Sequence, residues 1–237
     1  MLYTKFLFAG TTWIQELVWL VLNDFDFAKA EAIPLVDRFP FLEFSMFFNG
    51  TKARAKFQHN IKNKAFIDNI YKTVDRVVEM HSPRYIKTHL PLSLLPPDLL
   101  DTCKVVYTAL EWTPCFDNVK ESWEKRNHPN MLFIFYEESL KDLASTVDRV
   151  VKFFGKTITD EQRSRVCVHL SFENFKKNKS VNKNIFKELD LLNKDASFVR
   201  KGKAGTWREL FDEEMTRQAE QWMADNLRDT DLRYPTV

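Results

Sequence analysis

The sequence predicts a single α/β domain in which helices flank a central, mainly parallel sheet. Short runs of apolar and β-branched residues, typical of buried strands, alternate along the chain with segments that repeat apolar residues at helical spacing. The residues Gly10-Thr11-Thr12 stand between an apolar run and a helical pattern, where a phosphate-binding turn can form. An α/β domain of this kind binds its ligand at the carboxyl ends of the parallel strands.

Composition narrows the class of protein. The 237 residues are 44% hydrophobic and 14% aromatic, which suffices for one substantial core. A formal net charge of +2 gives no reason to expect nucleic acid or a membrane surface as a partner. No apolar run is long enough to span a bilayer, and no signal peptide is recognised. The three cysteines, Cys103, Cys115 and Cys167, lack metal-ligand spacing, which predicts free thiols, no metal and a cytoplasmic location.

The first element expected is a strand that includes Leu7–Ala9, followed by a tight turn at Gly10 and a helix over residues 13–23. Glycine permits close backbone approach, and Thr11 and Thr12 offer hydroxyl groups. The first turn of a helix adds unpaired N–H groups and the positive end of its dipole. This combination fits a P-loop-like phosphate cradle, but an ordinary helix N-cap uses the same residue types, so both interpretations stay open.

An aromatic segment punctuated by two prolines follows at residues 33–48 and predicts a long loop. One interpretation is that Phe39, Phe41 and Phe44 line an apolar pocket for an acceptor molecule. The alternative is that these rings belong to the core beneath the loop. The basic stretch at residues 52–64 is expected to be solvated.

Three further strands are expected at residues 83–91, 104–109 and 131–136. Alternate residues of a strand share a face, so the first of these places Lys87 and His89 on one side of its end. The other two are short apolar runs, typical of strands buried in a parallel sheet.

Helices are expected between and after these strands, because apolar residues recur there at helical spacing. Their ranges are 66–80, 115–126, 140–154, 160–170 and 209–227, with a helical start in 92–100. Gly155 is expected to end the helix over 140–154, and Thr159 to cap the next one. The last helix carries its apolar side on Phe211, Met215, Trp222 and Met223.

Two basic stretches stand in the second half of the chain. The lysines at residues 176–183 fit a solvated surface as well as they fit a binding site. In Arg200 to Gly205, glycines are interleaved with cations. A glycine beside a cation lets the main chain and a fork of donors approach one phosphate together, which favours an anion site there.

Three separated stretches together resemble the cytosolic sulfotransferases: Gly10-Thr11-Thr12-Trp13, Lys87-Thr88-His89-Leu90-Pro91 and Arg200-Lys201-Gly202-Lys203-Ala204-Gly205. The resemblance covers nearly all of residues 1–237 as one sulfotransferase domain, and residues 226–232 are most similar to insect members. It implies transfer of a sulfuryl group from 3′-phosphoadenosine 5′-phosphosulfate (PAPS) to a hydroxyl or amine of a small apolar acceptor, such as a phenol or alcohol. It also implies that no metal is used, and it allows a homodimer.

The resemblance assigns roles to particular residues. The co-substrate would be held at its 5′-phosphate by Gly10, Thr11 and Thr12, at its adenine by Trp13 and Tyr136, and at its 3′-phosphate by Arg200, Lys201 and Gly202. His89 matches the family's general base, since a neutral imidazole with a pKa of about 6.5 can accept a proton near neutral pH. Lys87 would stabilise charge on the sulfuryl oxygens.

The chain also departs from the family's pattern. Phe8 and Ala9 occupy the places of a lysine that contacts the bridging oxygen and of a serine. After Ala109 an Arg-Asn-Pro-Lys-Asp segment and a helix that bears a serine are missing near residues 110–112, and an N-terminal segment of the family has no counterpart. A second interpretation therefore remains open, namely a catalytically inactive sulfotransferase-like binding protein or the product of a truncated gene.

Overall fold

A parallel sheet lies at the centre of the computed structural model. The structure describes residues 2–6, 10–48, 73–110, 116–181, 202 and 204–235, with residues 2–6, 47, 48 and 206 described by their backbone alone. In this part of the chain the sheet has four strands in the order β2-β1-β3-β4. Their bounds are Leu2–Phe6 for β1, Tyr85–Thr88 for β2, Lys104–Ala109 for β3 and Met131–Phe135 for β4.

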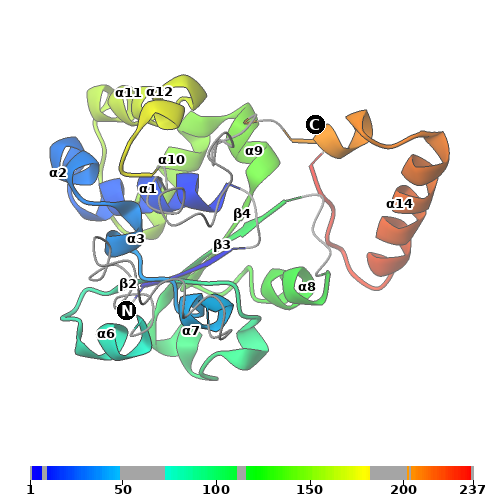
Figure 1. Ribbon diagram of the computed structural model, residues 1–237, viewed down its shortest axis with the longest axis horizontal. Coiled ribbons are helices and arrows are strands. Elements are labelled where there is room, and N and C mark those ends of the chain that lie inside the picture. Colours follow the sequence, from blue (N-terminus) through cyan, green and yellow to red (C-terminus); the bar gives the residue numbers. More distant parts are fainter. Residues whose placement is uncertain are drawn as a thin grey trace.

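Helices cover both faces of the sheet (Figure 1). One face packs against α1 (Thr11–Leu22), α2 (Phe27–Ala32), α3 (Leu35–Arg38), α10 (Leu143–Phe153), α11 (Asp160–His169) and α12 (Phe172–Lys177). The other packs against α6 (Thr73–Glu79), α7 (Leu99–Thr102) and α8 (Phe116–Glu124). The elements α9 (Tyr136–Lys141) and α14 (Glu213–Asn226) and the 3₁₀ turns η1 (Phe44–Phe48), η3 (Leu92–Leu94) and η4 (Thr206–Glu209) complete the described part. This confirms the predicted α/β class.

Strand residues alternate between the two cores. Val106 and Ile134 lie in the cluster with α1 and α10, whereas Val105, Tyr107 and Phe133 lie in the cluster on the opposite face. This period of two follows from the geometry of a β-strand, and it explains why both faces of the central strands are apolar.

The register sets the carboxyl edge of the sheet. Lys5 of β1 is level with Thr88 of β2, and the next residue of β1, Phe6, is level with Thr108 of β3. Ala109 is in turn level with Phe135, the last residue of β4. The segments that follow β1, β2 and β4 therefore begin at the same edge.

Several boundaries differ from those expected from the sequence. The helix over 140–154 is two helices, because Asp142 ends α9 and its carboxylate caps α10 by accepting a hydrogen bond from Ser145 N at 2.9 Å. The helix α2 was missed, although Asp26 caps it in the same way through Lys29 N at 3.0 Å. The capping of α11 by Thr159 is confirmed and forms a capping box with Gln162.

The C-terminal helix was placed too early and its packing was overestimated. It begins at Glu213, after a separate 3₁₀ turn, and Ala219 is the buried residue of α14. Met215 is 49% exposed and Trp222 is 38% exposed, so the predicted apolar side is largely open to solvent among the described residues. The ring of Trp222 contacts Phe116 of α8 at 4.8 Å between centroids. Figure 1 shows α14 at the right of the view, beyond α8.

The cysteines fit the expectation of free thiols where they are described. Cys103 is buried and Cys167 is half-buried, and both are free, while Cys115 lies outside the described residues. Burial raises the pKa of the Cys167 thiol above its ordinary value. Across the described ranges, no helix has the length and apolar character that a bilayer crossing requires.

Candidate active site

The turn at Gly10 opens the helix α1 at the carboxyl edge of the sheet. Gly10 has φ 73°, in the left-handed region, and its carbonyl accepts the hydrogen bond from Ile14 N at 3.0 Å. A Cβ atom placed on Gly10 would lie 2.2 Å from Cδ2 of Tyr136, so both conformation and space require glycine here. Among the described residues no side chain caps α1, and a helix leaves its first N–H groups unpaired. Thr11 and Thr12, each 7% exposed, belong to this first turn.

Two aromatic side chains join this turn to distant parts of the chain. The indole N–H of Trp13 donates a hydrogen bond to the Leu170 carbonyl at 2.7 Å, and its ring meets Tyr136 edge-on at 6.1 Å between centroids. Tyr136 directly follows β4 and lies against Gly10. Burial, and secondarily the charge of Glu137, raises the pKa of the Tyr136 phenol above its usual range.

Gly202 comes close to the same region through Phe172. It has φ 60°, and a Cβ there would lie 2.4 Å from Cδ2 of Phe172. Phe172 begins α12, two residues after the Leu170 carbonyl that Trp13 contacts. The segment 170–172 therefore links the first and third sequence motifs, because it contacts both Trp13 and Gly202. Arg200 and Lys201, predicted to bind the 3′-phosphate, lie outside the described residues.

Lys87 and His89 share one aromatic neighbour at the end of β2. The Lys87 ammonium lies 5.1 Å from the centroid of the Phe41 ring, and the His89 imidazole lies 4.7 Å from the same ring at 66°. Lys87 is 8% exposed, whereas His89 is half-buried and can be reached from solvent. The predicted placement of the two side chains on one side of the strand is confirmed by this shared contact.

The rings of the aromatic loop divide between the core and the surroundings of His89. Phe39 is 1% exposed and packs in the core against Tyr85, with ring centroids 5.5 Å apart. Its assignment to an acceptor pocket is therefore corrected, because a ring this deeply buried is a core residue. Phe41 and Phe44 are half-buried and contact each other at 5.5 Å beside His89.

Two acidic residues that the sequence analysis did not single out support these elements. Glu43 accepts hydrogen bonds from the turn that carries His89, at 2.5 Å from its backbone N. Glu16, on α1, is fully buried and bridges Arg38 at 2.7 Å and His169 at 2.9 Å. Burial lowers the pKa of Arg38, and the Glu16 carboxylate opposes this shift. An acidic residue on the apolar face of α1 was the signal that could have revealed this network.

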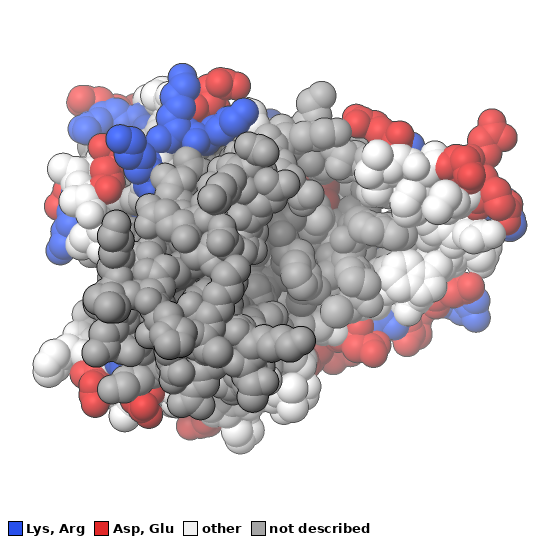
Figure 2. All heavy atoms as spheres, viewed as in Figure 1, with Lys and Arg blue, Asp and Glu red and all other residues white. Residues whose placement is uncertain are grey.

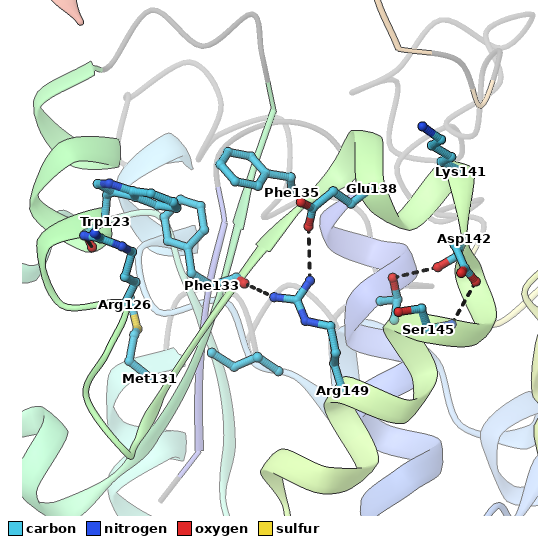
Figure 3. Close-up of a pocket in the computed structure, with 12 residues that line it drawn as sticks. Trp123, Arg126, Met131, Phe133, Phe135, Glu138, Lys141, Asp142, Ser145 and Arg149 are labelled. Atoms are coloured by element: carbon cyan, nitrogen blue, oxygen red, sulfur yellow. Dashed lines mark hydrogen bonds and ion pairs between the residues drawn. The ribbon is translucent and has the colours of Figure 1, made fainter. Parts of the chain in front are cut away.

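A cavity of about 850 Å³ lies against β4 (Figure 3). Its walls include Phe133, Phe135 and Arg149, and Arg149 donates to the Phe133 carbonyl at 2.7 Å and pairs with Glu138 at 3.1 Å. None of the predicted site residues that the structure describes lines this cavity.

A second cavity, of about 790 Å³, lies among α2, α11 and α12. Figure 2 shows Lys and Arg gathered over the α11–α12 corner, where Arg165 and Lys177 line the cavity. Lys176, Lys177 and Lys179 are exposed, as expected of a solvated surface. They lie in the last turn of α12 or just beyond it, where the helix dipole favours positive charge.

Fold and site together define an α/β protein in which a glycine turn opens a helix, and Lys87 and His89 share the Phe41 ring, at one edge of a parallel sheet. The chain belongs to the sulfotransferase family: the profile described as "Sulfotransferase domain" matches residues 8–111 and 108–231. Members of this family transfer a sulfuryl group from PAPS to small acceptors.

Individual relatives agree with this assignment. The chain is 24% identical to Sulfotransferase 1E1 of Bos taurus over 96% of its own length and 83% of the relative's. It superposes with a TM-score of 0.90 on a retinol dehydratase solved with retinol and PAP, at 37% identity and over 99% of this chain and 83% of the other. A structure of retinol dehydratase with androsterone and the inactive cofactor PAP gives a TM-score of 0.89 at 37% identity, over 100% and 83% of the two chains.

Proposed function

We propose that this protein transfers a sulfuryl group from PAPS to the hydroxyl of a small apolar acceptor, with His89 as the general base. The observation that supports this most strongly is the shared carboxyl edge of the sheet. Three positions lie at this edge: the turn at Gly10 after β1, His89 after β2 and Tyr136 after β4. Three strand spacings of ~4.8 Å separate β2 from β4, so the backbones of these two strands lie roughly 14 Å apart.

The described residues fit a nucleotide with phosphates. A Cβ atom at Gly10 or at Gly202 would clash with an aromatic ring, so glycine lets the Tyr136 and Phe172 rings pack directly against the main chain at these two turns. In our proposal the N–H groups of Thr11 and Thr12 bind the 5′-phosphate, and Trp13 and Tyr136 hold the adenine. PAPS supplies the sulfuryl group when it is bound.

The chemistry assigned to this chain is proton transfer and charge stabilisation. Neutral His89 accepts the proton of the acceptor hydroxyl as that oxygen bonds to sulfur and the bond from sulfur to the bridging phosphate oxygen breaks. Lys87 stabilises negative charge on the sulfuryl oxygens. Phe8 stands at the place of the family's lysine, so Lys87 has to supply the positive charge near the reacting group.

The acceptor we propose is a flat apolar alcohol or phenol. Phe41 and Phe44 present half-buried rings beside His89. Retinol and androsterone, which are bound in the structures of retinol dehydratase, are molecules of this chemical kind.

The free thiols of Cys103 and Cys167 support a cytoplasmic setting.

The alternative is a binding protein without turnover, and the sequence at Phe8 favours it. The two blocks matched by the family profile also meet at residues 108–111, where the chain departs from the family's pattern. Such a protein would bind PAP but transfer no sulfuryl group.

Isothermal titration with PAP and a transfer assay with ³⁵S-labelled PAPS and a panel of phenols and alcohols separate these functions. We expect PAP binding and transfer in the wild type, and a loss of about 10²–10⁴-fold in transfer with intact binding in His89→Ala. The control is His81→Ala, at an exposed residue. Binding without transfer would support the inactive protein, and absence of binding would refute both functions.

A further inference from the structure

The segment before η1 is fastened to the strand that ends at His89. Lys87 N donates to the Pro40 carbonyl at 2.9 Å, and Leu42 N donates to the Lys87 carbonyl at 2.8 Å. These bonds make Phe41 the parallel bridge partner of Lys87. The segment therefore runs beside β2, and its next residue, Glu43, reaches the turn that follows the strand.

The carboxylate of Glu43 holds that turn through one oxygen. Oε1 accepts hydrogen bonds from the Thr88 hydroxyl at 2.8 Å, from His89 N at 2.5 Å and from Leu90 N at 2.9 Å. Glu43 is 7% exposed. Burying a carboxylate is costly unless hydrogen bonds compensate, and bonds to a charged acceptor are stronger than neutral ones. One oxygen atom of Glu43 thus ties three consecutive residues, 88–90, to the segment before η1.

His89 is held from both its main chain and its ring. Its backbone N–H is bonded to Glu43, and its imidazole packs edge-on against Phe41, two residues away on the same segment. Its carbonyl also accepts a longer bond, at 3.4 Å, from the Asn118 amide of α8. Few backbone and side-chain orientations satisfy all of these contacts.

We propose that Glu43 is a positioning residue that fixes the 88–90 turn and thereby aims the His89 imidazole at the acceptor hydroxyl. This inference rests on the proposed role of His89. A displacement of about 1 Å in a catalytic group can cost a factor of about 10² in rate, so an effect through geometry alone is large enough to measure.

Two substitutions of Glu43 test how far its side chain contributes to catalysis by positioning His89. Glu43→Ala removes the acceptor for all three donors, and Glu43→Gln keeps the shape and an oxygen acceptor but removes the charge. We expect Glu43→Ala to lower kcat by about 10–10²-fold and Glu43→Gln to lower it less, while the Kd for PAP changes by less than about 2-fold. In the His89→Ala background, Glu43→Ala should add almost no further loss, because the two residues act as one unit. The control is Asp26→Ala, which removes a carboxylate bonded to a backbone N–H at α2.

A measurement without turnover keeps this inference separate from the proposed function. NMR should show slow hydrogen exchange at the His89 and Leu90 amides and contacts between the His89 and Phe41 rings. In Glu43→Ala, exchange at both amides should be at least about 10-fold faster and the ring contacts weaker. If the alanine variant fails to fold, the same measurement is made on Glu43→Gln. A wild type that binds PAP but lacks transfer would refute the function, and the NMR result alone would then decide the positioning role. Two results would overturn the positioning role of Glu43. One is amide exchange and ring contacts in Glu43→Ala that equal those of the wild type. The other is a loss of kcat on Glu43→Ala that is as large in the His89→Ala background as in the wild type.

Discussion

The substitution Gly10→Ala tests whether the left-handed turn and the Tyr136 ring together shape the cradle. Alanine at φ 73° costs roughly 1–2 kcal/mol. Its Cβ would also stand 2.2 Å from Cδ2 of Tyr136, about 1.2 Å inside ordinary contact at 3.4 Å. Overpacking of this kind costs roughly 1–3 kcal/mol. We therefore expect the free energy of unfolding to fall by about 2–5 kcal/mol, which lowers Tm by roughly 4–20 °C in a chain of this size.

Gly155 provides the matched control, because it has φ 64° but no atom within 4 Å of an added Cβ. Gly155→Ala should cost only the conformational part, roughly 1–2 kcal/mol. Calorimetry gives both Tm values, and titration with PAP should show affinity at least about 10-fold weaker in Gly10→Ala alone. Equal destabilisation by the two substitutions, with PAP affinity unchanged in both, would refute the steric reasoning. Replacing Tyr136 by alanine as well should remove most of the difference.

Two further predictions concern stability. Arg38→Ala leaves the buried Glu16 carboxylate without its guanidinium partner, and we expect the free energy of unfolding, measured by chemical denaturation, to fall by about 3–5 kcal/mol. The control Arg163→Ala removes exposed ion pairs and should leave the denaturation midpoint nearly unchanged. Equal midpoints in the two variants would contradict the role of burial. Burial raises the pKa of Tyr136, so its stabilising contribution is fully present below about pH 10 and is lost as the pH rises through the folded-state pKa. Between pH 8 and 11.5, Tm should therefore fall less steeply with rising pH in Tyr136→Phe than in the wild type. Parallel curves of Tm against pH would contradict this contribution of Tyr136.

Local patterns in the sequence predicted the strands β2, β3 and β4, whereas β1 is Leu2–Phe6 and the residues Leu7–Ala9 of the predicted first strand lie outside the described part of the chain. The strands β3 and β4 are short apolar runs buried on both faces, and their length, their β-branched or aromatic residues and the turns that bound them identified them as strands. Thr159 was recognisable as a cap because its hydroxyl acts within one turn of helix. The short helix α2 was missed because it has too few residues for an apolar period to show.

The candidate site was predictable in its motifs but not in its supports. Glu43 lies 45 residues from Thr88 and Glu16 lies 153 residues from His169, so no local pattern reports their hydrogen bonds. Phe39 and Phe41 are two residues apart and have the same side chain, yet Phe39 is a core residue and Phe41 contacts His89. Packing against Tyr85 decides this difference, and composition does not encode it.

The sequence by itself determined the fold class, the glycine turn at the start of α1 and the placement of Lys87 and His89 on one side of the end of β2, because each depends on residues close together in the chain. Only the tertiary structure decided that Tyr136 covers Gly10, that Phe172 covers Gly202 and that Glu43 holds the turn of His89. Those contacts join segments that meet only when parallel strands align their carboxyl ends, and their strength depends on burial that exists only in the folded chain.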